Sequence, residues 1–576
     1  NCNLNARNFH GDTALHHMVA RADLNCTLSL LGHGADVNAI GANGYTPLHV
    51  SIKANNVAIV QALIVFGANV DLLNASGYSA RHLAAISTQS PAKDTILYIL
   101  HSVCARRCSQ SIKNCTEGCA QDFTYNGVPP DNPFTRNLPL YDKVLLDDVM
   151  KNNLERKLQN PTNTDMNIDG ENSKQRQRRK KVKLLCMDGG GIRGLILIQI
   201  LCHIELVTNQ RIIDIFDWIA GTSTGSIIAY WFSQRKSLTG LRLLYFHFKD
   251  NVFHGNRPYS TEKLETLLKT KLSEANNINQ TVGDIWNESG KHLIISASRV
   301  DCFPPRLQLF CSHHRFTGSK NKILIWQALR ASSAAPTYFQ HYLPYIDGGL
   351  MSNNPTLDAL TEYFRYQQHG GQENLDMVLS IGCGFLQQNE MKKNFSAAFD
   401  KFNYFLDFRS FVNDFSYRLH HHQPWTYGNE LASHMKSQVT NCNDHIVSRS
   451  LLWCSCLNIT YCRLNSLLTK KIPLDESRND ELVQALWDVK LYSLKQWNYF
   501  NKIVDCLLSS SDDDNDNTRF CIADDREWRS SLIVPFGTNF VAVLYKCNSQ
   551  QQEDQHQQQQ TFKVLTLVNE IPVIVR

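Results

Sequence analysis

The stretch IFDWIAGTSTGSIIAYW, residues 215–231, decides how the middle of this chain folds. Its first six residues are mostly apolar and predict a buried strand, and the apolar run from Ser226 predicts a helix. Between them stands a Gly-x-Ser-x-Gly motif with Ser223 at its centre. Glycines flank the serine because a sharp strand-to-helix turn leaves no room for side chains beside it. The context predicts a nucleophile elbow that presents the Ser223 hydroxyl, with a turn formed by Gly221, Thr222, Thr224 and Gly225.

A second strand, turn and helix lie upstream. Residues 182–187 predict a buried strand, residues 195–204 predict a helix, and Asp-Gly-Gly-Gly-Ile-Arg-Gly joins them. This turn matches the Gly-x-Gly-x-x-Gly of dinucleotide sites, which would need an acidic residue about 20 residues on, near Asp214. The same geometry also stabilises a developing oxyanion with backbone N–H groups at a helix N-terminus. The elbow favours this second use, and the predicted oxyanion hole comprises Gly189, Gly190, Gly191, Ile192, Arg193 and Gly194.

A serine hydroxyl becomes a good nucleophile only when a base accepts its proton. The run Tyr-Leu-Pro-Tyr-Ile ends in Asp347, Gly348 and Gly349. Most Asp-Gly pairs form solvent-facing turns. This pair, however, follows a stretch of small residues at 331–336 and precedes Asn353-Asn354-Pro355. Asp347 is therefore the candidate base.

The first hundred residues are repetitive. Gly-Asp-Thr-Ala-Leu-His begins at Gly11, Gly-Tyr-Thr-Pro-Leu-His at Gly44 and Gly-Tyr-Ser-Ala-Arg-His at Gly77, a period of 33 residues. This period and motif are typical of ankyrin repeats, in which a turn and two helices form one unit of an all-α solenoid. Residues 2–5 fall on the end of a preceding unit, so we expect earlier repeats. The repeat explains the three motif histidines as turn-stabilising residues without a metal or catalytic role: His16, His49 and His82.

Composition excludes some classes of protein. The 576 residues are 43% hydrophobic and 19% charged, which predicts two to four largely globular domains. A net charge of +5 is too small to indicate a nucleic-acid partner. The most apolar stretches are interrupted by charged residues, so we expect peripheral rather than spanning membrane contact. The 18 cysteines are too few for a disulfide scaffold and favour a reducing cytoplasm.

Periodicity fades at residues 105–181, which predict a linker with one short helix near residues 141–158. Four cysteines supply enough thiolates for tetrahedral zinc, but they lack the usual C-x2-C pairs: Cys104, Cys108, Cys115 and Cys119. Free thiols are favoured, and no metal is predicted. Seven basic residues at 174–183 indicate a solvated boundary, with attraction to anionic lipid or nuclear import as alternatives. Residues 509–576 predict a low-complexity, flexible tail with strand-like pieces at 541–545 and 564–568.

In this order, the glycine turn, the Gly-Thr-Ser-Thr-Gly elbow and the Asp-Gly-Gly motif resemble those of the patatin-like phospholipases. Preceded by ankyrin repeats, they resemble the group VI, beta-type calcium-independent phospholipases A2 over most of residues 1–508. Arg257-Pro258-Tyr259 and residues 335–339 carry further likeness, whereas Ser226 replaces a usual glycine. The resemblance implies a three-layer α/β/α domain at 182–508, with its motif core at 184–366, after an all-α solenoid at 1–104. It also implies a dyad of Ser223 and Asp347 without histidine.

The implied activity is hydrolysis of the sn-2 acyl ester of glycerophospholipids to lysophospholipid and free fatty acid. No cofactor is expected: the sequence has no calcium-loop pattern, and the oxyanion assignment of the glycine turn argues against ATP. The ankyrin repeats imply protein partners, and the resemblance leaves a homodimer open. Related proteins bind calmodulin partly through a basic segment, but residues 367–376 contain no Lys or Arg, which argues against that contact. The implied location is cytoplasmic with reversible membrane association.

Two other functions remain compatible with the residues. An α/β-hydrolase with a Ser-Asp-His triad would need a histidine after Asp347, and five are available: His369, His420, His421, His422 and His434. The glycine turn after the first strand argues against this fold. A catalytically weak ankyrin adaptor would keep the repeats and lose the serine or the aspartate, yet both are present.

Overall fold

The computed structural model describes most of the chain up to residue 508 and three later strands. The described residues are 3–87, 90–108, 115–121, 123–129, 150–151, 153–155, 180–272, 278–313, 322–386, 442, 445–508, 541–546, 562–568 and 571–575. The chain divides into two compact units. One holds residues 1–131, 493–497 and 509–576, and the other holds residues 132–492 and 498–508.

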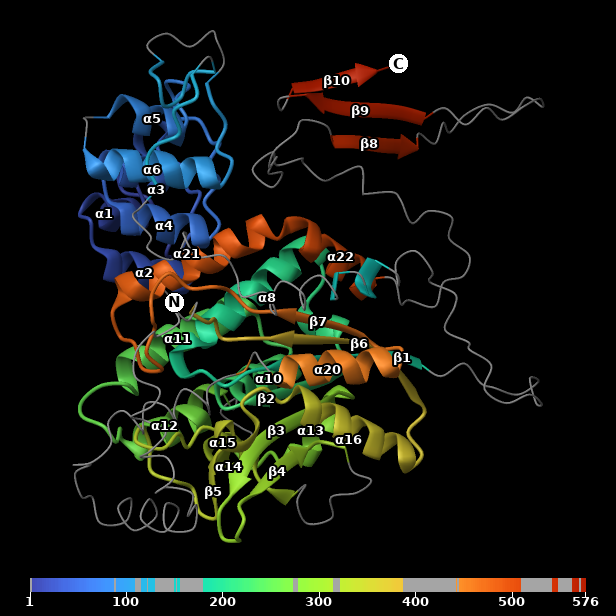
Figure 1. The fold of residues 1–576 in the computed structure, drawn as a ribbon. Coiled ribbons are helices and arrows are strands. Elements are labelled where there is room, and N and C mark those ends of the chain that lie inside the picture. Colours follow the sequence, from blue (N-terminus) through green and yellow to red (C-terminus); the bar gives the residue numbers. More distant parts are fainter. Residues whose placement is uncertain are drawn as a thin grey trace, which may run out of the picture. The chain divides into compact units, whose positions relative to one another are not determined.

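The N-terminal residues form three pairs of helices with the predicted period (Figure 1). The pairs are α1 (Ala14–Ala20) with α2 (Leu24–Gly32), α3 (Pro47–Lys53) with α4 (Val57–Val65), and α5 (Ala80–Ile86) with α6 (Pro91–Ser102). The second helix of each pair begins at a polar N-cap whose side chain accepts a backbone N–H bond: Asp23, Asn56 and Ser90. These caps satisfy N–H groups that the first turn leaves free. The predicted helical repeats are confirmed.

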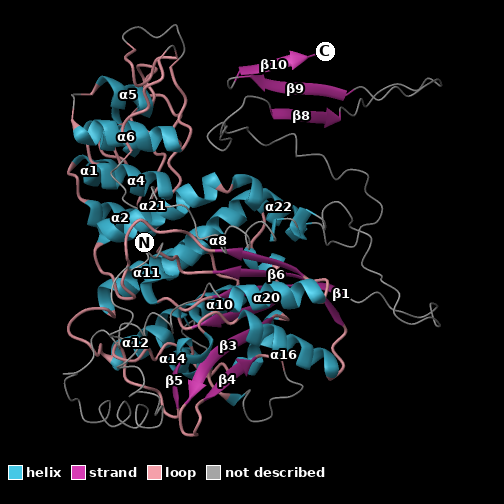
Figure 2. Ribbon diagram, viewed as in Figure 1, coloured by secondary structure: helices cyan, strands magenta, loops and turns pink. Residues whose placement is uncertain are grey.

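The other unit is built on a seven-stranded sheet (Figure 2). Its central strand is β1 (Lys180–Met187), flanked by β2 (Trp218–Thr222) and β6 (Glu373–Ile381). The order is β4-β3-β2-β1-β6-β7, completed by β3 (His292–Arg299), β4 (Arg306–Cys311), β7 (Thr460–Leu464) and β5 (Tyr345–Asp347), which pairs with β3. Only the pairings of β3 with β4 and β5 are antiparallel. The carboxyl ends of β1 and β2 therefore lie side by side, where open α/β sheets place their sites.

Helices cover both faces of this sheet, which confirms the predicted α/β/α architecture. α16 (Thr356–Gln368) and α20 (His445–Cys456) pack into one hydrophobic core with residues of β1, β2, β6 and β7. α8 (Gly194–Thr208), α10 (Thr224–Ser233) and α11 (Leu238–Asn251) pack together. The remaining helices are α9 (Ile212–Ile215), α12 (Thr261–Leu267), α13 (Val282–Ser289), α14 (Ile325–Ser332), α15 (Gly349–Ser352), α21 (Asn479–Lys495) and α22 (Trp497–Leu508).

One helical window, Gly191–Thr208, is long and apolar enough to cross a membrane by length and composition. We expected no such run, because charged residues interrupt the most apolar stretches of the sequence. In the structure 67% of this window is buried inside the fold. The window comprises the turn Gly191–Arg193 and helix α8, most of whose apolar side chains are buried in the fold.

Four further segments differ from expectation or lie partly outside the described residues. Residues 105–108 and 115–129, apart from residue 122, hydrogen-bond to the last repeat rather than forming a free linker. Part of the predicted 141–158 helix is seen, at residues 150–151 and 153–155. Of the basic run, Lys180, Lys181 and Lys183 are described and belong to β1, whereas residues 174–179 lie outside the described residues. In the tail, strands β8 (Val541–Lys546) and β9 (Phe562–Val568) confirm both strand-like pieces, and β10 (Ile571–Val575) was missed.

Candidate active site

Ser223 occupies a strained position between β2 and α10. Its φ of 51° and ψ of −117° place a non-glycine residue at positive φ, a conformation that costs free energy and concentrates at functional sites. Its N–H donates to Ser332 Oγ at 2.8 Å. The turn is further fixed by Thr222, whose hydroxyl donates to the Ser352 carbonyl at 2.6 Å, and by Thr224, which hydrogen-bonds Tyr245. This is the predicted elbow geometry.

The glycines of the elbow are required by close backbone approach. A Cβ on Gly221 would lie 2.2 Å from the Gly225 carbonyl oxygen, and a Cβ on Gly225 would lie 2.3 Å from the Met187 carbonyl oxygen. Both distances are far below van der Waals contact, so a side chain at either position would force the backbone apart. Ser226, which departs from the usual glycine, fits here because its hydroxyl donates to the Ser223 carbonyl at 2.6 Å.

Asp347 ends strand β5 opposite Ala297 of β3 and is only 6% exposed. Its Oδ1 accepts the N–H of Gly349 at 2.7 Å, and the Ser223 side chain lies close enough to lower its pKa. Burial raises the pKa of Asp347 to about 7, against the opposing effects of the Gly349 hydrogen bond and of Ser223. A carboxylate with a pKa near neutrality is suited to accept a proton at physiological pH. The structure thus brings together the two residues predicted as nucleophile and base.

Gly348 and Gly349 give Asp347 this setting. A Cβ on Gly348 would lie 2.4 Å from the carbonyl oxygen of Ser296 in β3. A Cβ on Gly349 would lie 2.9 Å from Asp347 Oδ1, inside the space that the N–H bond uses. The Asp-Gly-Gly motif is therefore a buried strand end rather than a solvent-facing turn.

The hydrogen bonds of the glycine loop after β1 reduce the number of backbone N–H groups that could form the predicted oxyanion hole. Four of its six amides donate to backbone carbonyls: Gly189 to Asn353 at 3.0 Å, Ile192 to Leu474 at 2.8 Å, Arg193 to Gly190 at 3.1 Å, and Gly194 to Gly191 and Ile192. Within the described residues, the N–H groups of Gly190 and Gly191 have no acceptor. Gly189 lies beside the serine, since its added Cβ would be 3.4 Å from Ser223 Cβ. Gly190 and Gly191 are therefore the donors that remain available to an oxyanion.

A buried ion pair, which the sequence analysis missed, holds this loop. Asp188, fully buried, accepts two bonds from Arg463 of β7, at 2.9 Å and 2.5 Å. Burial lowers the pKa of Arg463, but the Asp188 carboxylate more than offsets this effect and the pKa lies above its ordinary value. Arg463 also donates to Ser380 of β6 at 2.8 Å. The pair ties the strand end before the glycine loop to β7, and the Ser380 bond adds β6.

A second anchor explains the Arg257-Pro258-Tyr259 motif. Leu474 accepts the Ile192 N–H of the glycine loop, and the adjacent Asp475 accepts bonds from Arg257 Nε at 2.7 Å and Tyr259 Oη at 2.5 Å. The Tyr259 N–H donates to the carbonyl of Tyr338 at 2.7 Å, so the motif at 335–339 joins the same network. Both motifs therefore position the glycine loop from a distance.

Of the five histidines of the alternative triad, the structure describes His369. His369 caps the end of α16, where its Nδ1 hydrogen-bonds the Arg365 carbonyl at 2.7 Å. The other four candidates lie outside the described residues: His420, His421, His422 and His434. Among the residues the structure describes, the groups that shift the pKa of Asp347 include no histidine.

Comparison with known families agrees with this geometry. Residues 185–360 match the patatin-like phospholipase family, and residues 15–107 match ankyrin repeats in three copies. The first segment contains the glycine loop, Ser223 and Asp347.

Curated relatives carry phospholipase names. The rat 85/88 kDa calcium-independent phospholipase A2 is 33% identical over 362 residues, which cover 58% of this chain and 41% of the relative. The Caenorhabditis elegans intracellular phospholipase A2 is 29% identical over 540 residues, 90% of this chain and 43% of the relative. A cGAMP-activated phospholipase of Escherichia coli is 31% identical over 204 residues, 32% of this chain and 56% of the relative. The chain spans about two fifths of the length of the first two relatives. It carries ankyrin repeats at residues 15–107 followed by a patatin-like phospholipase domain at residues 185–360.

Proposed function

We propose that this chain is a serine phospholipase that hydrolyses the sn-2 acyl ester of glycerophospholipids. One observation carries the proposal: Ser223, held at positive φ on a strand-to-helix elbow, interacts with the buried carboxyl group of Asp347, whose pKa is raised by burial to about 7. The phospholipase names of the relatives supply the substrate class.

The reaction follows from the geometry in two steps. Asp347 accepts the Ser223 proton as Oγ attacks the ester carbonyl, and the N–H groups of Gly190 and Gly191 stabilise the oxyanion. The proton then passes from Asp347 to the departing lysophospholipid, which leaves an acyl-enzyme. In the second step Asp347 takes a proton from water as the water oxygen attacks the acyl carbonyl. The bond between the acyl carbon and Ser223 Oγ then breaks, Asp347 returns the proton to Oγ, and the fatty acid leaves.

No step in this scheme uses a cofactor. We therefore propose activity without calcium and without ATP, and the calcium-independent relatives support the first part. The serine and the carboxylate supply the nucleophile and the base, while backbone amides supply the electrostatic stabilisation that a metal provides in other hydrolases.

The protein is proposed to reach its substrate by binding to the surface of the membrane. Leu343 is 62% exposed and lies four residues before Asp347, and Met351 is 45% exposed and lies four residues after it. Exposed apolar side chains next to a catalytic residue favour contact with a lipid surface. Protein partners are proposed for the ankyrin repeats, because such solenoids offer extended binding surfaces.

The test is hydrolysis of a phospholipid with distinguishable sn-1 and sn-2 acyl chains, in the presence of a calcium chelator. We expect release of the sn-2 fatty acid by the wild-type chain and none by Ser223→Ala. Release of the sn-1 chain would correct the regiochemistry. Loss of activity in chelator that returns with added calcium would overturn the metal-free scheme.

A further inference from the structure

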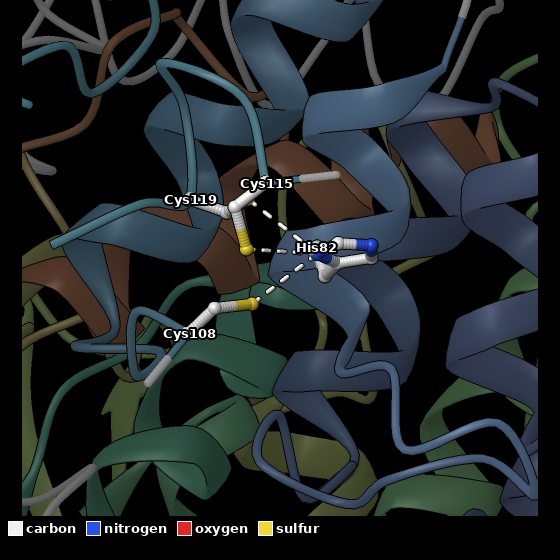
Figure 3. A group of neighbouring side chains, drawn as sticks. All are labelled: His82, Cys108, Cys115 and Cys119. Carbon is white, nitrogen blue, oxygen red and sulfur yellow. Dashed lines mark hydrogen bonds between the residues drawn. The ribbon is translucent and has the colours of Figure 1, made fainter. Parts of the chain in front are cut away.

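One histidine and three cysteines converge in the ankyrin-bearing unit: His82, Cys108, Cys115 and Cys119 (Figure 3). Their ligand atoms all lie within 4.8 Å of one another. His82 Nδ1 faces the three sulfur atoms, at 3.2 Å from Cys108, 3.6 Å from Cys115 and 3.5 Å from Cys119. All four side chains are buried or half-buried, and the three cysteines are free thiols.

His82 departs from the role of the equivalent repeat histidines. In the first two repeats Nδ1 accepts the N–H of the threonine that caps the helix, at 3.2 Å for His16 and 3.1 Å for His49. These two residues confirm the predicted turn-stabilising role. His82 does not follow them, because its Nδ1 faces the thiols instead, and its ring stacks on Tyr78 with an interplanar angle of 23°. The expectation that the repeat explains all three histidines is therefore wrong for His82.

Arg81, which precedes His82, also differs from the equivalent residue of the first two repeats, and it contacts the segments that carry the cysteines. Arg81 stands where the first two repeats have the buried Leu15 and Leu48, and it is only 2% exposed. Its guanidinium donates to the carbonyls of Gly118 and Ala105, each at 3.0 Å. These carbonyls belong to the segments that carry the cysteines, so Arg81 holds both segments against the helix that carries His82.

Further hydrogen bonds set the two cysteine segments against each other. The Cys108 N–H donates to the Cys119 carbonyl at 2.9 Å, and Arg107 Nη1 donates to the Ala120 carbonyl at 2.7 Å. The Cys119 N–H in turn donates to Thr116 at 3.0 Å. These contacts do not involve the thiols, and they hold the backbone of Cys108 beside that of Cys119.

We propose that His82, Cys108, Cys115 and Cys119 bind one zinc ion. Tetrahedral zinc with Zn–S near 2.3 Å and Zn–N near 2.0 Å requires sulfur-to-nitrogen separations of about 3.5 Å, which the three measured separations approach. A closed Cys3His set is a structural zinc site, without the open position of a catalytic one. The fourth ligand comes from the repeat, and Cys104, which the spacing had suggested, lies outside the cluster.

The ion would act as a cross-link. Residues 105–108 and 115–121 form no helix, and the described part contains only an isolated bridge between Cys108 and Ala120. Zinc would join these segments to α5 and close the end of the repeat array, where solenoids need a capping element. Binding releases thiol protons, so the affinity is expected to fall at acidic pH.

The test measures zinc in the full chain, purified under reducing conditions without chelator, by elemental mass spectrometry. We expect about one zinc ion per chain, and a several-fold loss in Cys108→Ser, Cys119→Ser and His82→Ala. Cys104→Ser is the matched control and should retain zinc. Cys311→Ser is a second control, because Cys311 lies in another Cys, His and Glu group, with His313 and Glu362, that could hold a metal ion.

A spectroscopic measurement on the wild type tests the site without any substitution, so it remains informative if the variants fail to fold. The chelator-treated chain is titrated with Co²⁺, which reports tetrahedral thiolate ligation through its visible and near-ultraviolet absorption. Thiolate-to-cobalt bands that zinc abolishes support the site. The proposal is overturned if the wild type holds no zinc and gives no such bands, if zinc is lost in Cys311→Ser but kept in Cys108→Ser, or if the intact mass shows a disulfide among these cysteines.

Discussion

Arg463 and Asp188 form a two-point ion pair in the interior of the catalytic sheet. The two side chains are 5% and 0% exposed, and the residues are 275 positions apart in the sequence. Arg463 lies opposite Ser380 in the pairing of β7 with β6, and it reaches past β6 to the residue that follows β1. The bond fixes the position of Asp188, where the glycine loop begins. It comes from β7, which is separated from β1 by β6.

Removing one partner of this pair should be costly. Arg463→Met leaves the Asp188 carboxylate buried without its cation, and we expect the free energy of unfolding to fall by about 3–5 kcal/mol. The control is Arg478→Met, which removes an arginine that is 64% exposed and paired with Glu476 and Glu481. That change should cost less than about 1 kcal/mol. Denaturant unfolding of both variants checks the prediction, and equal small losses would contradict it.

Replacing either member of the dyad should stop hydrolysis. Ser223→Ala removes the nucleophile and should leave the free energy of unfolding within about 1 kcal/mol, since the new side chain is small. Asp347→Asn keeps the shape but cannot accept a proton. His369→Ala should retain activity because this ring bonds the Arg365 carbonyl. Initial rates on labelled phospholipid are the measurement. A single inactive but folded variant at His369, His420, His421, His422 or His434 would establish a triad instead.

Hydrolysis should depend on pH through Asp347. Burial raises the pKa of this carboxyl group to about 7, so the base form is lost as the pH falls through that value. We expect kcat/KM to rise with pH and to level off above an apparent pKa near 7. The measurement is a pH profile on a substrate without ionisable groups in this range. A profile that is flat between pH values well below and above this pKa would show that Asp347 is not the base.

The raised pKa of Asp347 should also lower the stability of the folded protein at neutral and alkaline pH. The pKa of Asp347 in the folded protein lies above that of an ordinary aspartate in the unfolded chain. The neutral form therefore favours folding below the unfolded pKa, and this stability is lost as the pH rises through about 7. Asp347→Asn does not titrate, so its advantage over the wild type should grow by up to about 4 kcal/mol between acidic and slightly alkaline pH. Unfolding of both proteins across this range gives the difference. An advantage that is independent of pH would contradict the raised pKa.

The exposed side chain of Leu343 should be needed for activity on phospholipid vesicles but not for activity on a soluble monomeric ester. Leu343→Ser removes an exposed apolar side chain near Asp347, and burial of such a side chain in lipid is worth about 1.5–3 kcal/mol. We expect a roughly tenfold loss of activity on vesicles and little change on a soluble monomeric ester. Leu452→Ser on α20 is the control, because Leu452 is 64% exposed and belongs to a helix outside the dyad. Equal losses on both substrates would indicate damage to the site rather than to lipid contact.

The sequence by itself determined the parts of this protein that are local. The repeat period predicted the helix pairs, since each unit uses the same turn and caps. The elbow could be predicted because Gly221 and Gly225 are needed within three residues of Ser223, where close backbone approach excludes side chains. Asp347 could be proposed because the Asp-Gly-Gly motif stands in one short stretch.

Only the tertiary structure decided the contacts between distant residues. The choice of Gly190 and Gly191 among six loop amides depends on Asn353 and Leu474, which accept two of the others. Sequence spacing does not show which carbonyls approach a loop. His82 illustrates the same limit, because its motif is that of a repeat histidine, yet the contacts of residues 105–108 and 115–121 with the last repeat bring three thiols to its Nδ1. A motif fixes local backbone geometry, whereas the partner of a side chain depends on how the whole chain packs.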